Sequence, residues 1–295
     1  MSVLDEQIRD IAGTRFRFLR GGPPAEPIVF IHGGVPGQTP YCSSADLWAP
    51  SLDLFARRRQ VVALDMPGAG GTGGMAGDWL TVAAFGRHVR ALIDALQLGP
   101  CHLVGHDPGG LVALWLAMDS PMLVRSVTIV ASPTAAPSGD GVANLALADP
   151  PAPLWSRASQ AWAFDRLSYA HHHIDAALLD RCVAWSAGAA HRQAVEIVAQ
   201  DALQRLYLPS VGDAKARLYE LCRDAGLAVP VQIVWGTNDP LTTIDHGFML
   251  YRVVAARQAA AQFHLINRAG SFPFREEPET FHQIVASFQD GLAAN

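Results

Sequence analysis

The strongest constraint on this sequence is a repeated alternation between short, unbroken apolar runs and longer stretches with helical periodicity. Each apolar run is about five residues long, which is typical of strands that are buried on both faces. Such strands form parallel sheets whose helical connections cover both faces. The sequence therefore predicts an α/β fold with a mostly parallel central sheet. The predicted strands are Pro27–Ile31, Val61–Asp65, Cys101–Gly105, Ser126–Ala131, Val231–Trp235 and Gln262–Ile266.

Helical patterns lie between most of these strands, with apolar residues at intervals of three and four. They occur near 81–97, 109–118, 245–257 and 276–290. The alternation stops between residues 133 and 210, where a loop rich in Pro, Gly, Ser and Ala leads into helical, aromatic-rich sequence without a convincing strand. Because two more strands follow, we interpret residues 133–210 as a helical cap or lid. It is inserted into one core domain formed by residues 1–132 and 211–295.

Composition limits the classes of partner. Half of the 295 residues are apolar and 17% are charged, which is ample for a large buried core. The net charge is −5 and the only basic run is Arg57–Arg59, so nucleic acid is not an expected partner. No apolar run approaches the ~20 residues needed to span a bilayer, and the acidic start Met1–Glu6 does not resemble a signal peptide. We expect a cytoplasmic protein that contacts neither membranes nor nucleic acid.

Three loops follow predicted strands, where an open α/β sheet places its active site. Gly105–Gly109 reads Gly-His-Asp-Pro-Gly and joins a strand directly to a helix, with the spacing of a nucleophile elbow. Ile31–Gly37 is glycine-rich, and its amides could hold an oxyanion. Trp235–Pro240 ends a late strand with the carboxylate of Asp239. The three loops in this order are far more specific than any one of them alone.

These loops resemble those of the α/β-hydrolase superfamily, and within it those of the meta-cleavage-product hydrolases, which break C–C bonds in vinylogous diketones. His32–Gly37 (HGGVPG) is similar to their HGGxPG loop. Trp235–Asp239 and Ile244–Gly247 are similar to their acid loop and to the LDHG that begins the next helix. The terminal region is similar through Arg268–Ser271, Glu276, Glu277, Pro278 and Phe281. The resemblance implies the α/β-hydrolase fold over residues 27–290.

The resemblance also implies a catalytic triad of serine, acid and histidine, and here the pattern is broken. The three positions hold Asp107, Asp239 and Ser271, so only the acid fits. The residue after the nucleophile position usually gives one oxyanion N–H, and here it is Pro108, which has none. Serine hydrolysis of the standard type is therefore not expected.

Two carboxylates in a lidded pocket repel each other and are desolvated, so one of them is expected to keep a proton near neutral pH. Such a pair transfers protons without forming an acyl-enzyme. Our leading hypothesis is a cofactor-independent enzyme that uses Asp107 as general acid and base. Its substrate would be a small enolisable carbonyl compound, aromatic or polycyclic among the options, and the chemistry of the lyase, tautomerase or cyclase type.

Two alternatives stay open. In the first, Asp107 is the nucleophile of a hydrolase for a C–C, epoxide or ester bond, and a relocated histidine acts as base; His32, His106 and His171–His173 are the candidates. In the second, the chain is an inactive, ligand-binding homologue.

The remaining predicted site residues surround this trio. Gly33, Gly34 and Val35 are assigned to the oxyanion loop, and His106 and Phe272 to the wall of the pocket. Arg181 falls roughly where the C–C hydrolases hold a substrate carboxylate, with a surface arginine as the simpler alternative. No metal or organic cofactor is expected, and a homo-oligomer is left open.

Overall fold

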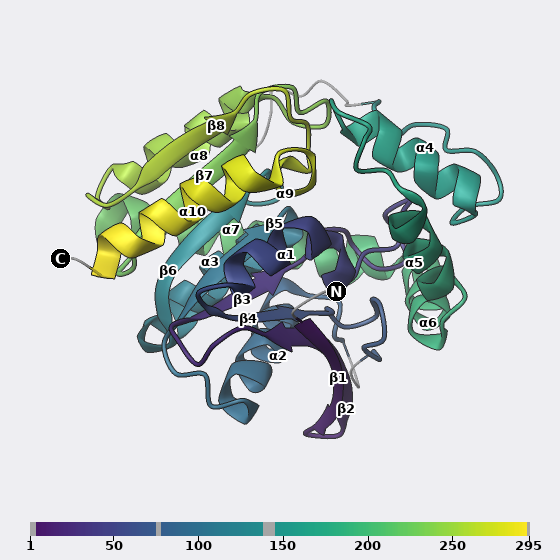
Figure 1. Cartoon of the computed structure of the whole chain (residues 1–295), viewed down its shortest axis with the longest axis horizontal. Helices are drawn as coiled ribbons and strands as arrows, with labels where there is room; N and C mark the ends of the chain where they lie inside the picture. Colours follow the sequence, from purple (N-terminus) through teal and green to yellow (C-terminus); the bar gives the residue numbers. More distant parts are fainter. Residues whose placement is uncertain (1–3, 75–77, 138–144, 294–295) are drawn as a thin grey trace.

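The computed structural model describes residues 4–74, 78–137 and 145–293. Its centre is an eight-stranded sheet in the order β1-β2-β4-β3-β5-β6-β7-β8 (Figure 1). Strands β3 to β8 are parallel, whereas β2 is antiparallel to both β1 and β4. The mostly parallel α/β fold is therefore confirmed. The strands are β1 (Leu4–Ile11), β2 (Thr14–Gly21), β3 (Pro27–Ile31), β4 (Gln60–Leu64), β5 (Cys101–His106), β6 (Val124–Val130), β7 (Val231–Gly236) and β8 (Gln262–Ile266).

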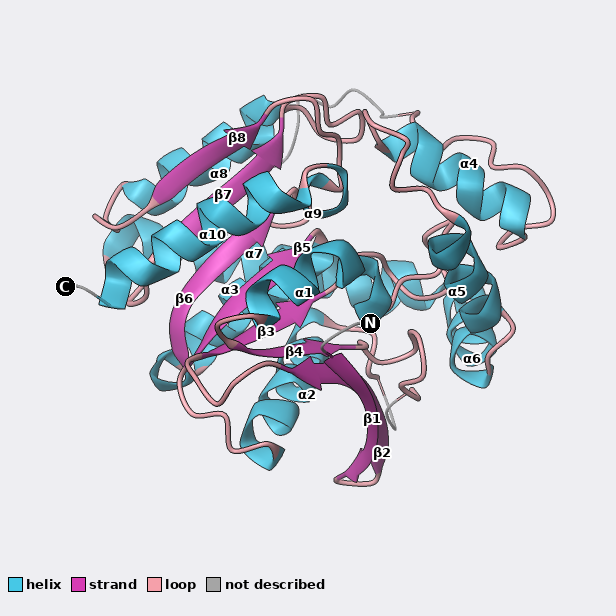
Figure 2. Ribbon diagram, in the orientation of Figure 1, coloured by secondary structure: helices cyan, strands magenta, loops and turns pink. Residues whose placement is uncertain are grey.

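The six predicted strands are β3 to β8, and their ends differ from the predicted ones by two residues at most. The hairpin of β1 and β2 was not predicted (Figure 2). Most of β1 is half-buried or exposed, so it has no apolar run. The two-residue turn places Ala12 at φ 51° and Gly13 at φ 78°, which matches the right-handed twist of a hairpin. A strand without buried residues, such as β1, has no apolar run that would mark it in the sequence.

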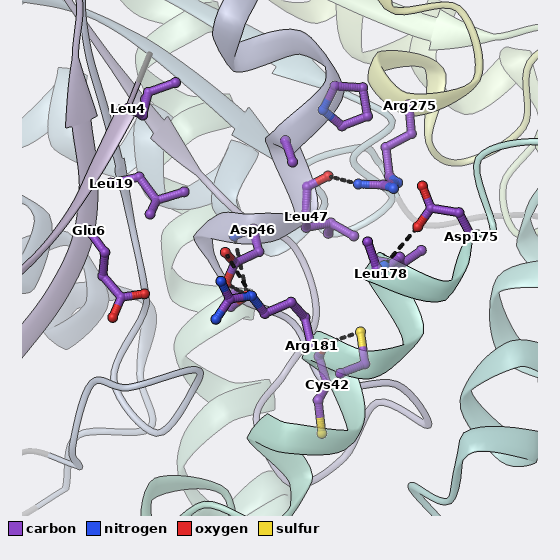
Figure 3. A pocket seen from close by; sticks show the side chains of 15 residues that line it. Leu4, Glu6, Leu19, Cys42, Asp46, Leu47, Asp175, Leu178, Arg181 and Arg275 are labelled. Atoms are coloured by element: carbon purple, nitrogen blue, oxygen red, sulfur yellow. Dashed lines mark hydrogen bonds and ion pairs between the residues drawn. The ribbon is translucent and has the colours of Figure 1, made fainter. Parts of the chain in front are cut away.

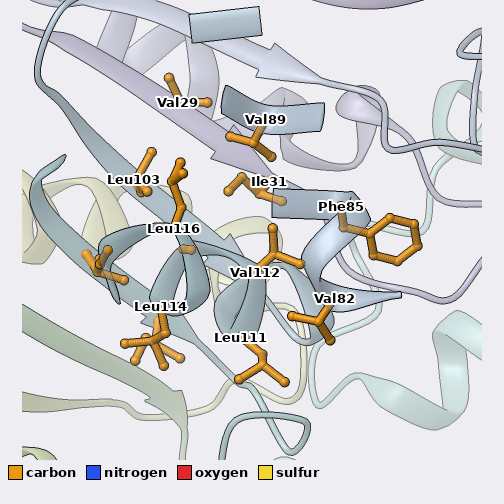
Figure 4. Packing of buried hydrophobic residues seen from close by; sticks show 14 of the residues in the cluster. Val29, Ile31, Val82, Phe85, Val89, Leu103, Leu111, Val112, Leu114 and Leu116 are labelled. Atoms are coloured by element: carbon orange, nitrogen blue, oxygen red, sulfur yellow. The ribbon is translucent and has the colours of Figure 1, made fainter. Parts of the chain in front are cut away.

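Side chains alternate between two apolar cores, one on each face of the sheet. In β3, Val29 and Ile31 contribute to one core, and Ile28 and Phe30 to the other. The first core is covered by α2 (Val82–Ala95), α3 (Pro108–Asp119), α7 (Leu208–Asp224) and α8 (Ile244–Ala255). Figure 4 shows α2 and α3 residues packed on Val29 and Ile31. The second is covered by α1 (Ala49–Ala56) and α10 (Pro278–Ala293).

The chain between β6 and β7 is helical, and its helices α4, α5 and α6 lie to one side of the sheet in Figure 1. Within its described residues no strand occurs. It contains α4 (Arg157–Leu167), α5 (Ala176–Ser186), α6 (Ala189–Ile197) and the π-helical segment η3 (Val198–Tyr207). The predicted end of the insertion at 210 falls inside α7, which packs against α2 and α3. Residues 138–144 of the predicted insertion lie outside the described residues.

The remaining short elements are η1 (Ala45–Trp48), η2 (Pro121–Leu123) and α9 (Pro273–Glu276). Among the described residues, no helix is long and apolar enough to span a membrane.

Strand β5 and helix α3 approach each other closely at Gly105. A Cβ on Gly105 would lie 2.2 Å from the carbonyl oxygen of Gly109 and 2.7 Å from the nitrogen of Gly110. Both neighbours are backbone atoms, so they cannot rotate away as a side chain would. We expect Gly105→Ala to lower the free energy of unfolding by about 1–3 kcal/mol, as measured by urea denaturation. Gly73→Ala is the matched control, because a Cβ there meets no atom within 4 Å; an equal loss in both variants would refute the steric explanation.

Candidate active site

Asp107 is the single residue between β5 and α3, and its backbone is strained. It has φ 47° and ψ −121°, a conformation that residues other than glycine rarely adopt. Its N–H donates to the carbonyl of Val130 (3.1 Å), and its own carbonyl accepts from the Ser132 hydroxyl (2.6 Å). Pro108 begins α3, where a missing N–H costs nothing because the first helical N–H groups lack partners. The turn has the geometry of a nucleophile elbow with aspartate at its tip.

Two donors hold the Asp107 carboxyl group. The Thr134 hydroxyl donates to Oδ1 (2.9 Å), and the Gly34 N–H also donates to the carboxylate. Burial raises the pKa of Asp107 to about 7, and the negative charge of Asp239 adds to that rise. The two donors oppose it, since they stabilise the ionised form. Near neutral pH the carboxyl group is therefore present in both protonation states.

Asp239 and Ser271 lie together. The Ser271 hydroxyl donates to Asp239 Oδ1 (2.6 Å), which also accepts from the N–H groups of Leu241 (3.0 Å) and Thr242 (3.3 Å). Burial raises the pKa of Asp239 to about 6, although the bond from Ser271 counteracts it. The carboxylate of Asp239 thus faces the Ser271 hydroxyl.

The Ser271 loop is fastened to the helical insertion. Glu276 Oε1 accepts from the N–H of Gly270 (2.9 Å) and its Oε2 from those of Tyr169 and Ala170 (2.8 Å each). The Ser271 N–H donates to the carbonyl of Leu167, the last residue of α4 (2.8 Å). The position of Ser271 therefore depends on the insertion.

His106 is engaged by the Ser271 loop and by aromatic side chains. Its Nε2 donates to the carbonyl of Ser271 (2.9 Å), and its ring lies among Trp48, Phe272 and Phe274. Burial lowers its pKa to about 3, so the ring is neutral. His106 is thus a structural link between the elbow strand and the Ser271 loop.

The amides of the predicted oxyanion loop have partners within the protein. The Gly34 N–H is directed to Asp107, and the Val35 N–H donates to the Thr39 hydroxyl (2.7 Å). These two amides are therefore already engaged. Gly33 has a packing role, since a Cβ there would lie 2.3 Å from His106 Nδ1 and 3.0 Å from Asp107 Cβ.

The structure gives no relocated base. Throughout the described residues, which include all the histidines, none is hydrogen-bonded to Asp107. His32 donates from Nδ1 to the Gly33 carbonyl (2.8 Å) and accepts at Nε2 from the Met66 N–H (3.0 Å). His173 lies between Ser168 and Arg275, while His171 and His172 are exposed. Nor do three or more His, Cys, Asp or Glu side chains in the described chain form a group that could hold a metal ion.

Arg181 is not placed beside Asp107. Its Nε lies 3.8 Å from Asp46 Oδ1, and it lines a cavity between the N-terminal hairpin and α5 (Figure 3). The residues lining that cavity include neither Asp107 nor Ser271. The Arg181 side chain is about half exposed (54%), which fits the simpler alternative of a surface arginine. Phe272 is fully buried and packs on His106, Tyr41 and Phe164.

Two tyrosines near Asp107 were missed. Burial raises the pKa of Tyr41, and the charges of Asp107 and Asp239 contribute. Burial and the Asp107 charge also raise the pKa of Tyr207, which ends η3. The Tyr207 hydroxyl lies near Thr134, and no group in the described residues accepts its hydrogen with good geometry. Neither tyrosine belongs to a recognisable sequence motif. The only sequence feature that pointed towards Tyr207 was the high aromatic content of the helical insertion.

Comparisons with known proteins find relatives over part or most of this chain. A 125-residue segment is 38% identical to the dihydrolipoyllysine-residue acetyltransferase component of an acetoin cleaving system from Cupriavidus necator; it covers 42% of this chain and 31% of that protein. Over 275 residues, 23% are identical to a 2-hydroxy-6-oxononadienedioate/2-hydroxy-6-oxononatrienedioate hydrolase from Cupriavidus pinatubonensis, covering 90% of this chain and 88% of that one.

Among solved structures, a meta-cleavage product hydrolase from Pseudomonas fluorescens superimposes with a TM-score of 0.77 at 20% identity, covering 98% of each chain. That likeness concerns the fold. The sequence model of the alpha/beta hydrolase fold matches residues 26–278. The chain belongs to the α/β-hydrolase fold family.

Proposed function

We propose that this chain is an α/β-hydrolase-fold enzyme that acts on a small enolisable carbonyl compound, with Asp107 as its general acid and base. The observation that carries the proposal is the setting of Asp107. Its carboxyl group lies at the elbow, is bonded to Gly34 and Thr134, and has a pKa of about 7. A group with a pKa near the working pH is an efficient proton-transfer catalyst. Members of this fold family place the reacting group at the same position.

In the proposed reaction, the Asp107 carboxylate takes a proton from the carbon next to the substrate carbonyl. The electron pair of that C–H bond forms a C=C bond, the π pair of the carbonyl moves to its oxygen, and the result is an enolate. The Tyr207 hydroxyl, which lacks an acceptor among the described groups, is assigned to donate to that oxygen. The protonated Asp107 then returns its proton to another atom of the enolate, which completes a tautomerisation. Alternatively it protonates a leaving group on the next carbon, whose bond breaks as the carbonyl re-forms and a new C=C bond is made.

Ser271 is not assigned as a nucleophile. Its hydroxyl donates to Asp239 and is thereby directed away from attack on a substrate. The Asp239 charge favours the protonated form of Asp107, so we assign Asp239 and Ser271 to tuning that group. The helical insertion serves as the lid in this proposal, because it supplies Tyr207 and binds the Ser271 loop through Leu167.

Asp107→Asn should slow proton exchange at the substrate carbon by about 10²–10⁴-fold, because an amide cannot carry the proton. The assay is NMR detection of deuterium incorporation from D₂O into β-diketones, enol lactones and 2-hydroxy-6-oxodienoates. Asp245→Asn, on the exposed start of α8, is the control and should keep full activity. Near-normal exchange in a folded Asp107→Asn variant would contradict the proposal. Ligand binding without exchange in the normal protein would favour an inactive, ligand-binding homologue.

The protonation of Asp107 can be tested without a substrate. Its folded pKa of about 7 is above its ordinary value of 3.8, so the folded protein binds more protons than the unfolded chain between these pH values. The stabilising contribution of this group is present below that window and is lost as pH rises through about 7. The normal protein should therefore lose stability relative to Asp107→Asn as the pH rises from ~5 to ~8. The difference between their free energies of unfolding should grow by at most ~1.4 kcal/mol per unit of pKa shift. A pH-independent difference in urea denaturation would show that Asp107 ionises normally.

Hydrolysis is the second candidate, and the relatives give it at least as much support. In one form, an Asp107 oxygen attacks an electrophilic carbon and forms an ester as the bond from that carbon to the leaving group, or the epoxide C–O bond, breaks. Water then adds to the ester carbonyl, and the bond between this carbonyl carbon and the original aspartate oxygen breaks. The product leaves with the original aspartate oxygen, and Asp107 keeps an oxygen from solvent. In the other form, Asp107 activates water directly, and the solvent oxygen enters the product.

Turnover in H₂¹⁸O separates these reactions, with mass spectrometry of the Asp107 peptide and the product as the readout. Our leading proposal expects no label in either one. Label in Asp107 would establish the ester route, and label in the product alone would establish hydrolysis with Asp107 as base. A parallel incubation of the protein in H₂¹⁸O without substrate controls for exchange of the Asp107 carboxyl oxygens with water outside turnover.

A further inference from the structure

The cavity lined by Arg181, which we call the hairpin–lid cavity, has a volume of about 350 Å³. Its walls come from β1 and β2, from η1 with the start of α1, from α5 and from Arg275 on α9. Figure 3 shows Arg275 and Asp175 on one side and Glu6 with Leu4 and Leu19 on the other. Four leucines line the cavity, one each from β1, β2, η1 and α5: Leu4, Leu19, Leu47 and Leu178. A volume of this size lies within the range of small-molecule sites.

Arg275 is the unusual group in this wall. It is only 4% exposed, and its three hydrogen-bond acceptors in the described structure carry no charge. They are the carbonyl of Leu47 (3.0 Å), the carbonyl of His173 (3.1 Å) and the His173 ring nitrogen Nδ1 (3.3 Å). Burial and the guanidinium itself lower the pKa of His173 to about 3, so that ring is neutral. Burying a cation without a carboxylate in direct contact is costly unless another anion binds there.

The acidic side chains of the cavity are already matched. Glu6 and Asp46 both form ion pairs with Arg17 (2.7 and 2.9 Å), and Asp46 also faces Arg181. Asp175 caps α5 by accepting from the Leu178 N–H (2.8 Å) and acts on Arg275 only through space. Asp175 is exposed, so water screens its charge. The buried charge left to be matched is that of Arg275.

We propose that the hairpin–lid cavity binds a monocarboxylate with an apolar body, its carboxylate on Arg275 and its body against the leucines. This site is separate from the proposed reaction site, because Asp107, Asp239 and Ser271 do not line it. A guanidinium has a planar set of donors that suits a carboxylate. Two of the five N–H groups of Arg275 remain for such a ligand once the bonds to Leu47 and His173 are counted.

The test is calorimetric titration of the full chain with octanoate, and with octanamide as its uncharged counterpart. Octanoate should bind in a 1:1 ratio and more tightly than octanamide. Arg275→Met should weaken octanoate binding by about 10–100-fold, the usual effect of losing a charge-assisted hydrogen bond, and should leave octanamide binding nearly unchanged. Equal binding of octanoate and octanamide would overturn the proposal, as would unchanged octanoate binding by Arg275→Met.

Two further variants keep the test decisive if Arg275→Met does not fold. Ala177→Trp places an indole at the cavity wall and should abolish binding, whereas Ala176→Trp, on the exposed neighbour that does not line the cavity, should not. Asp175→Asn keeps a good helix cap but removes the opposing charge, so octanoate should bind several-fold more tightly. Octanoate binding that survives Ala177→Trp, or an absence of any binding, would refute the site.

Asp107→Asn separates this inference from the proposed function. It should leave octanoate affinity unchanged, even if the same variant abolishes proton exchange. Loss of octanoate binding in Asp107→Asn would place the ligand at the elbow and overturn the separate site. Failure of the exchange assay has no bearing on the titration.

Discussion

The close backbone contact between β5 and α3 is the constraint on which the site depends. Gly105 allows β5 to touch α3, Gly109 allows α3 to approach the end of β3, and a single residue, Asp107, makes the turn between β5 and α3 at φ 47°. Since the turn is that tight, the side chain of residue 107 has to project from it beyond the end of the strand. The bonds to Val130 and Ser132 hold the strained residue on both sides. Backbone packing therefore fixes the position of residue 107, whichever side chain that residue carries.

The chemistry then follows from which groups surround that tip. In the serine enzymes of this fold a histidine connects the acid to the nucleophile, whereas here Asp239 accepts from the Ser271 hydroxyl and from the N–H groups of Leu241 and Thr242. A serine hydroxyl is too short and too weak a base to take over the proton from residue 107. Asp107 is instead held by Gly34 and Thr134 in a buried setting, which brings its pKa to about 7. Burial has thereby turned a residue that is ordinarily ionised into one that can exchange a proton.

The helical insertion is joined to the core by polar contacts that converge on the last loop of the sheet. Glu276 binds the backbone of both the Ser271 loop and the end of α4, and Arg275 binds His173 and η1. Neighbouring residues of one short helix thus reach two separate places. Glu276 supports the proposed reaction site, whereas Arg275 faces the hairpin–lid cavity.

The sequence by itself determined the parallel sheet and the tight strand-to-helix turn at Asp107, because apolar runs and glycine spacing record local geometry. It missed the β1–β2 hairpin, whose half-exposed strands have no such run. Only the tertiary structure decided that His106 turns to Ser271, that Gly34 binds Asp107, that Tyr207 reaches the site and that Arg181 does not. Those outcomes depend on contacts between segments far apart in the chain, and on the direction in which a side chain leaves its helix. Spacing along the sequence carries no record of either.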